Sequence, residues 1–129
     1  MTETGALPDG HVVGELGLHQ GRDGDAVVGR ATVVSEMCVP GSGALRTSVV
    51  LTWADILAGA VAGRAMEPRI PLTLDLEVQV GRAAHAGTVI VAEAALVRAG
   101  RTIVVTECWF RDAAAVSYTH LTLPTILRV

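Results

Sequence analysis

One carboxylate interrupts an apolar stretch of the sequence and is the first candidate for chemistry. Residues 48–64, SVVLTWADILAGAVAGR, are apolar on nearly every side of a helix, which is typical of a helix that is buried. Asp55 lies in the middle of this helix. Burying a carboxylate is costly unless it has partners. Asp55 is therefore either part of a functional site or a structural acid paired with Arg46 or Arg64.

The residues before this helix are suited to holding negative charge. The loop 38–48, CVPGSGALRTS, is rich in glycine, and Thr47 or Ser48 is a suitable helix cap. The unpaired N–H groups at the helix N-terminus can stabilise a developing oxyanion. The loop lacks the Gly-Lys-Ser/Thr core of a phosphate-binding loop, which excludes that function.

Other reactive side chains give weaker signals. Cys38 has no evident histidine partner, and Cys108 lies in an apolar strand pattern, where a buried inert thiol is the default. His11, His19 and His85 do not have the spacing of metal ligands. We expect no metal site and no metal or redox cofactor.

The elements before the helix have strand patterns. Residues 11–19 and 26–35 are rich in strand-forming residues, and the segment 20–25, QGRDGD, has the composition of a turn. The sequence therefore predicts a hairpin of two strands ahead of the helix at 48–64.

The elements after the helix are also strands. Residues 71–80, PLTLDLEVQV, alternate strictly between apolar and polar side chains, which predicts a strand with one face on the core. Residues 87–98 and 101–112 form a hairpin around Ala99 and Gly100. One helix packed against an antiparallel sheet is an α+β arrangement.

Length and composition bound the function. The chain has 129 residues, of which 50% are hydrophobic, so it suits one domain with a real core. All ten basic residues are arginine and the net charge is −3, so no broad basic surface is expected for nucleic acid. We expect no run long and apolar enough to span a bilayer, no signal peptide, and a cytoplasmic protein from a GC-rich bacterial genome.

The order of these segments resembles the hotdog-fold acyl-CoA thioesterases, in particular their PaaI-like branch, over roughly residues 12–112. LRTSVVLTWADILAG, residues 45–59, is similar to the family segment in which Leu-His-Gly-Gly opens the helix and Ala-Asp follows within it. PLTLDLEVQV and the hairpin around AGRT are similar to later strands of the family. The resemblance implies a hotdog fold, a homodimer or tetramer with sites between subunits, and an acyl-CoA substrate.

The resemblance also implies roles for individual residues. Asp55 matches the helix acid that acts as general base or nucleophile on the thioester. Thr73 matches a hydroxyl residue that helps to hold the attacking water, although a β-branched residue is also ordinary in a strand. Arg46, Thr47 and Ser48 occupy the oxyanion and substrate-binding segment. The arginines that are candidates for weaker contacts with the phosphates of CoA are Arg82, Arg98 and Arg101.

The sequence departs from the family pattern in two places. Arg46 stands where the family has histidine, and Val39 replaces an asparagine of the preceding loop. Arg46 can orient a carbonyl or bind a phosphate, but it cannot act as a neutral imidazole. The alternatives to a thioesterase are a non-catalytic hotdog that binds acyl-CoA or an acyl carrier, and a hotdog enoyl hydratase or dehydratase.

The last residues look unlike the rest of the chain. Back-translation of residues 116–125, VSYTHLTLPT, is similar to a transposon-end adaptor used to prepare DNA for sequencing. We therefore expect a single hotdog domain over residues 1–115 that lacks its final strand, and an adaptor-derived tail over 116–129. Such a chain would be unstable or prone to aggregation, because sheet strands would be left unpaired.

The alternative is a genuine C-terminal strand, LTLPTILRV, which its proline would confine to a sheet edge. Amplifying the gene from its source DNA separates the two. An unbroken natural reading frame through these codons would exclude the adaptor, and a sharp, reversible melt of a clean dimer would contradict the expected instability.

Overall fold

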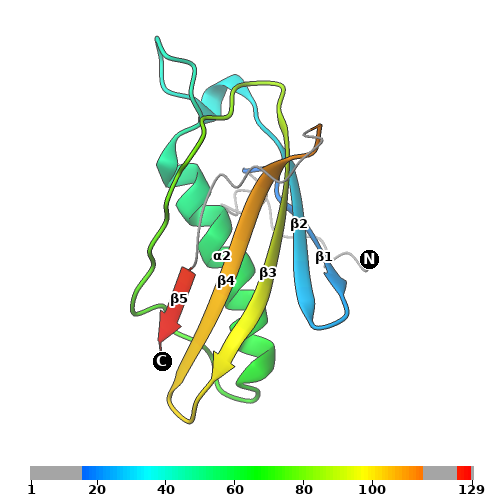
Figure 1. Cartoon of the computed structure of the whole chain (residues 1–129), viewed down its shortest axis with the longest axis vertical. Helices are drawn as coiled ribbons and strands as arrows, with labels where there is room; N and C mark the ends of the chain where they lie inside the picture. The colour runs from blue at the N-terminus through cyan, green and yellow to red at the C-terminus, as the bar shows by residue number, and fades with distance from the viewer. Residues whose placement is uncertain (1–15, 115–124, 129) are drawn as a thin grey trace.

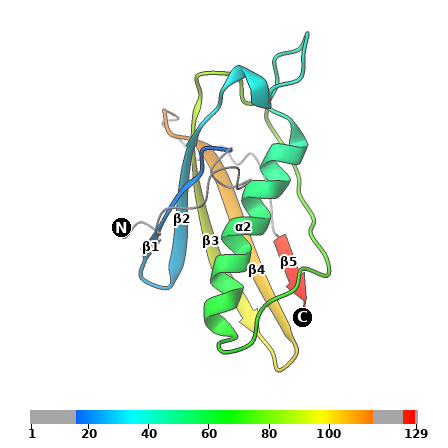
Figure 2. The same ribbon diagram turned by 180° about the vertical axis from the view of Figure 1, so that it is seen from behind.

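The computed structural model describes residues 16–114 and 125–128. One helix lies against one face of an antiparallel sheet whose strand order is β1-β2-β3-β4-β5 (Figures 1 and 2). The elements are β1 (His19–Asp23), β2 (Ala26–Thr32), the short 3-10 helix η1 (Ser35–Met37), α2 (Thr47–Ala65), β3 (Val89–Ala99), β4 (Ile103–Asp112) and β5 (Thr125–Arg128). The α+β fold with one central helix is confirmed.

The core lies between α2 and the inward face of the sheet. Trp53 and Leu57 of α2 are fully buried, as are Phe110 and Cys108 of β4. The rings of Trp53 and Phe110 stack with centroids 6.4 Å apart. The indole N–H of Trp53 donates to the backbone carbonyl of Leu16 at 3.3 Å, so this buried polar group has a partner.

The first hairpin forms later in the chain than predicted. The part of the first strand at residues 11–15 lies outside the described residues, and β1 begins at His19 and continues through Gly21 to Asp23. Gly24 has φ +62°, and a two-residue loop with glycine first matches the twist of the paired strands. The turn is therefore at Gly24 and Asp25, and the prediction of a turn over all of 20–25 is wrong.

The long hairpin of β3 and β4 is confirmed, with a shift of one or two residues at its ends. Side chains of β4 alternate between buried and partly exposed along the strand, because one face of the sheet meets α2. A bulge between Leu96 and Arg98 shifts the register near the turn. This hairpin and β2 form the centre of the sheet.

The predicted strand 71–80 is wrong for the described chain. Residues 70–81 are extended, but they pair with no described strand, and none of their backbone N–H or C=O groups has a hydrogen-bond partner among the described residues. Leu72 and Leu74 are 65% and 57% exposed, whereas Leu76 and Val78 pack against the core. Alternation specifies the two faces of a strand, but a strand also requires a hydrogen-bonded neighbour.

Two expectations about the helix are also corrected. Its N-cap is Arg46, in an extended conformation, and neither Thr47 nor Ser48 caps the helix with its side chain. By length and composition, α2 is apolar enough to span a bilayer, since its 19 residues have a mean hydropathy of 1.2. Eight of its side chains are buried in this fold, so its apolar character serves the core.

The tail contributes one described strand. Residues 115–124 lie outside the described part of the chain, and β5 pairs antiparallel with Ile103–Thr106 at the edge of the sheet. β5 begins directly after Pro124 in the sequence and is an edge strand of the sheet. This agrees with the alternative of a genuine C-terminal strand that its proline confines to an edge. The pairing does not reveal the origin of the codons, and the adaptor-derived tail stays a prediction.

Candidate active site

Two residues that are 18 positions apart in the sequence meet beside α2. The hydroxyl of Thr73 donates a hydrogen bond to Oδ1 of Asp55 at 2.6 Å. This is the short distance expected when a hydroxyl donates to an ionised carboxylate. Thr73 reaches Asp55 because residues 70–81 run alongside α2 (Figure 2). Two residues before Thr73, Pro71 lies near Gly63 of the same helix.

The surroundings of Asp55 differ from the expectation of burial. Asp55 is exposed in the described chain. No ion pair joins it to Arg46, Arg64 or any other described arginine, so the reading of a structural acid paired with arginine is wrong. Oδ2 of Asp55 has no hydrogen-bond donor among the described residues, and it is open to a water molecule or a substrate.

The start of α2 presents backbone donors at the surface. Arg46, Thr47 and Ser48 are exposed. The backbone N–H of Arg46 donates to Met37, whereas within the described chain the N–H groups of Thr47 and Ser48 meet no acceptor. Thr47 and Asp55 are eight residues apart, or about 12 Å along a helix axis. The carbonyl of one thioester therefore cannot contact the N–H of Thr47 and the carboxylate of Asp55 in the same chain.

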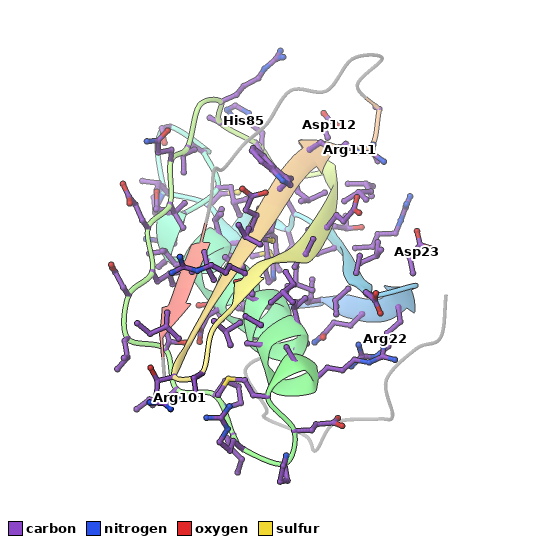
Figure 3. All side chains as sticks on the ribbon, turned by 60° about the horizontal axis from the view of Figure 1, so that its bottom comes forward. Arg22, Asp23, His85, Arg101, Arg111 and Asp112 are labelled. Carbon is purple, nitrogen blue, oxygen red and sulfur yellow. The ribbon has the colours of Figure 1, made fainter. Side chains whose placement is uncertain are left out.

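The three arginines proposed for CoA phosphates do not form one cluster. Arg82 lies near Ala84, whose carbonyl accepts from Leu45 just before α2. Arg98 and Arg101 lie at the β3–β4 turn, and Figure 3 shows His85 and Arg101 at opposite ends of the molecule. All three arginines are exposed.

Arg69 is a further basic residue near the candidate site that the sequence did not indicate. Its Nη1 donates to the carbonyl of Arg101 at 2.9 Å, which places Arg69 beside the β3–β4 turn. No sequence motif marks this residue, because the contact joins two turns that are 32 positions apart. Arg69 therefore joins Arg98 and Arg101 as a basic residue at that end of the fold.

The helix offers open space on one side of Asp55. Ala58 is fully buried and faces the core, which excludes it from a surface pocket. A methyl group built at Gly59 would meet nothing within 4 Å. The surface of the helix is therefore open at Gly59, one turn after Asp55, and closed at Ala58.

The thiols and imidazoles form no second site in the described chain. Cys108 is buried, and burial raises the pKa of its thiol to about 12. Cys38 is buried and donates to the carbonyl of Val34 at 3.6 Å. Among the described residues, no group of three or more His, Cys, Asp or Glu side chains is arranged to hold a metal ion.

The sequence matches the model of the thioesterase superfamily over residues 43–116, which is more than half of the chain. The chain belongs to the thioesterase superfamily. The match includes the end of the loop before α2, all of α2 with Asp55, the segment with Thr73, and the β3–β4 hairpin. A search of the curated proteins finds no significant match.

Solved structures agree on the fold at low sequence identity. A thioesterase of Haemophilus influenzae is 20% identical with a TM-score of 0.81, over 93% of this chain and 82% of that chain. The PaaI protein of E. coli, from the phenylacetic acid degradation operon, is 16% identical with a TM-score of 0.77, over 91% and 83%. A Streptococcus mutans protein solved with acetyl-CoA bound is 15% identical with a TM-score of 0.75, over 86% of each chain. These likenesses confirm the hotdog fold.

Proposed function

We propose that this protein hydrolyses the thioester of a small or medium acyl-CoA, with Asp55 as general base or nucleophile. The observation that carries the proposal is the hydrogen bond from Thr73 to Asp55. It fixes one carboxylate oxygen and leaves the other open on the exposed side of α2. Membership of the thioesterase superfamily supports the reaction class.

In the general-base route, Oδ2 of Asp55 takes a proton from a water molecule, and the water oxygen attacks the thioester carbonyl carbon. The carbonyl oxygen becomes an oxyanion. When it re-forms the carbonyl, the C–S bond breaks and the thiolate recovers the proton from Asp55. In the alternative route Oδ2 attacks directly, CoA thiolate leaves, and water hydrolyses the mixed anhydride. Single turnover in H₂¹⁸O tests the second route: attack of water at Cγ of Asp55 in the anhydride leaves ¹⁸O in Asp55 and transfers an Asp55 oxygen to the acid, whereas the general-base route places the label in the acid alone.

The oxyanion needs donors, and the described part of one chain places none of the proposed ones near Asp55. The free N–H groups of Thr47 and Ser48 are suitable donors, but they lie about two turns along the helix from Asp55. We therefore propose a homodimer in which the α2 N-terminus of one chain serves Asp55 of the other. Segment 70–81 has exposed leucines and a backbone without a hydrogen-bond partner among the described residues, so it is a candidate to pair with a second copy.

The substrate carries charge that basic residues can bind. A solved neighbour holds acetyl-CoA, which supports an acyl-CoA ligand for this fold. Arg46 lies next to the proposed oxyanion donors, and Arg69, Arg98 and Arg101 offer guanidinium groups at the β3–β4 turn for phosphates. Gly59 leaves open space for the acyl group beside Asp55.

The test is thiol release from a series of acyl-CoAs, by the protein whose gene has been amplified from source DNA. Asp55→Asn is expected to lower turnover by about a hundredfold to ten-thousandfold, the usual value of a general base. Binding of acyl-CoA without turnover by the folded protein would favour a non-catalytic binder. Addition of water to an enoyl thioester would favour a hydratase. Full activity of the Asp55→Asn variant would contradict the role of Asp55.

A further inference from the structure

The chain that follows α2 reaches Thr73 with little support from its own backbone. Residues 70–81 are extended, and none of their backbone groups has a hydrogen-bond partner among the described residues. Ile70 and Leu72 are 87% and 65% exposed, so burial of these two side chains does not fix the path of the chain. The position of Thr73 beside Asp55 therefore depends on contacts made by other side chains of this stretch.

Arg69 makes such a contact directly before the extended segment. Its backbone N–H donates to the carbonyl of Met66 at 2.8 Å, within the turn after α2. Its guanidinium Nη1 donates to the carbonyl of Arg101 at 2.9 Å, in the β3–β4 turn. The end of α2 and the β3–β4 turn lie at the same end of the molecule (Figures 1 and 2). Arg69 thus joins the start of segment 70–81 to both of them.

The β3–β4 turn is a firm support for this contact. The backbone N–H of Gly100 donates to the carbonyl of Ile103 at 2.7 Å, and a methyl group at Gly100 would lie 3.0 Å from that oxygen. Val104, the next residue of β4, belongs to a small buried cluster with Met66 and two alanines of α2. The acceptor of the Arg69 bond is therefore held by a closed turn and by packing against the end of the helix.

Arg69 is close enough to Thr73 to control its position. Four residues of chain separate the two by at most about 14 Å. Between them, the ring of Pro71 lies 3.7 Å from a methyl group built at Gly63, which is an ordinary van der Waals contact. The bond from Thr73 to Asp55 is 2.6 Å long, and a displacement of about 1 Å would break it. A small movement at the start of the segment is therefore enough to separate Thr73 from Asp55.

We propose that Arg69 is a positioning residue for the hydrolysis at Asp55. Its bond to the carbonyl of Arg101 ties the start of segment 70–81 to the β3–β4 turn and thereby holds Thr73 against Asp55. Arg69 acts through Thr73 and does not contact the reacting atoms. The inference rests on the proposed function, but the anchoring of segment 70–81 is measurable without any substrate.

The kinetic test is a double-mutant cycle on the acyl-CoA with the highest turnover. Arg69→Met removes the donor and keeps an aliphatic stem, and it is expected to lower kcat by about tenfold, as Thr73→Val does. In the Thr73→Val background the same change should cost less than about twofold, because the bond that Arg69 supports is already absent. Arg69→Lys retains a donor and should stay within about threefold of the wild type. Loss of a phosphate contact would instead raise KM and leave kcat unchanged.

The substrate-free test is the rate at which thermolysin cuts the folded protein within residues 70–81, followed by the masses of the fragments. A segment without its anchor opens more often, so Arg69→Met is expected to be cut about tenfold faster than the wild type. Arg64→Met is the matched control. It removes an exposed arginine of α2 that has no hydrogen-bond partner among the described residues, and it should keep the wild-type rates of cleavage and turnover.

Three results would overturn the proposal: equal losses of kcat from Arg69→Met with and without the hydroxyl of Thr73, a rise in KM alone, or an unchanged rate of cleavage. A thermal melt accompanies each variant, and Arg69→Gln, which is too short to reach Arg101, takes the place of Arg69→Met if that variant does not fold. Faster cleavage of Arg69→Met in a protein that releases no thiol from any acyl-CoA would contradict the hydrolysis and support the anchor.

Discussion

At the scale of single residues, the contact between Thr73 and Asp55 gives the sharpest prediction. Thr73→Val removes the hydroxyl that donates to Oδ1, while Thr73→Ser keeps it. A hydrogen bond to a charged group is worth about tenfold or more in an equilibrium, so Thr73→Val is expected to lower kcat by at least about tenfold. Thr73→Ser should stay within about threefold of the wild type, by the same reasoning. Equal losses in the two variants would mean that Thr73 acts through its methyl group and not through its hydroxyl.

The buried thiol of Cys108 predicts a pH dependence of stability. Burial raises its pKa from 9.0 to about 12, so the folded chain keeps this proton after the unfolded chain has lost it. The stability due to Cys108 is therefore full below pH 9 and declines as pH rises from 9 to about 12, by about 1.4 kcal/mol per pH unit. Denaturant melts of the wild type and Cys108→Ala at pH 8, 9, 10 and 11 measure the slope. A wild-type slope no steeper than that of Cys108→Ala would refute this account.

Some residues of the candidate site could be selected from the sequence and others could not. Asp55 stood out because it interrupts an apolar helix, and the family pattern pointed to Thr73. The exposure of Asp55 could not be predicted, because a helix that is apolar all round gives no sign of which side the chain itself covers. Arg69 carried no signal, since its contact depends on how two turns meet in space.

At the scale of elements, the packing around α2 predicts opposite effects on stability for substitutions at two glycines. A methyl group at Gly29 would lie 3.0 Å from Cδ2 of Leu57 and 3.1 Å from Cδ1 of Leu18. Gly29→Ala is therefore expected to destabilise the fold by about 1–3 kcal/mol through overpacking. Gly63→Ala meets only Pro71, at 3.7 Å, and should stabilise α2 by about 0.5–1 kcal/mol. Urea denaturation of both variants checks the signs, and a neutral Gly29→Ala would show that α2 can move away from the sheet.

The element-level predictions succeeded where pairing is local. The β3–β4 hairpin was predictable because both strands and their turn are contiguous in sequence. Segment 71–80 has an even clearer alternation, yet its neighbour is not fixed by any nearby residue. Its exposed leucines and unpaired backbone are what a strand shows when its partner is absent from the described chain. The prediction of a strand at 71–80 was therefore wrong about hydrogen-bond pairing and right about the extended conformation.

At the scale of the whole molecule, three surfaces are incompletely covered by the residues that the structure describes. They are the exposed side of α2, segment 70–81 and the outer face of the sheet. The first two lie on the same side and bear Asp55, whereas the third lies opposite. The catalytic dimer proposed above would cover the first two surfaces.

The catalytic dimer can be tested by mixing two inactive variants. Asp55→Asn removes the proposed base. Thr47→Pro removes one proposed oxyanion donor without opposing the helix, because proline is favoured at the first helical position and Arg46 already has the extended conformation that proline requires before it. Loss of an oxyanion donor costs about a hundredfold to a thousandfold in kcat. Each variant alone is thus expected to be nearly inactive.

If each site combines Asp55 of one chain with the α2 N-terminus of the other, a mixed dimer contains one intact site and one doubly defective site. Random mixing makes half of the dimers mixed, so about a quarter of wild-type activity should return when subunits are unfolded and refolded together. A site built within one chain would give no recovery, because every chain in the mixture carries a defect. Thiol release before and after co-refolding, with each variant refolded alone as the control, therefore shows whether the 12 Å between Thr47 and Asp55 is bridged by a second subunit.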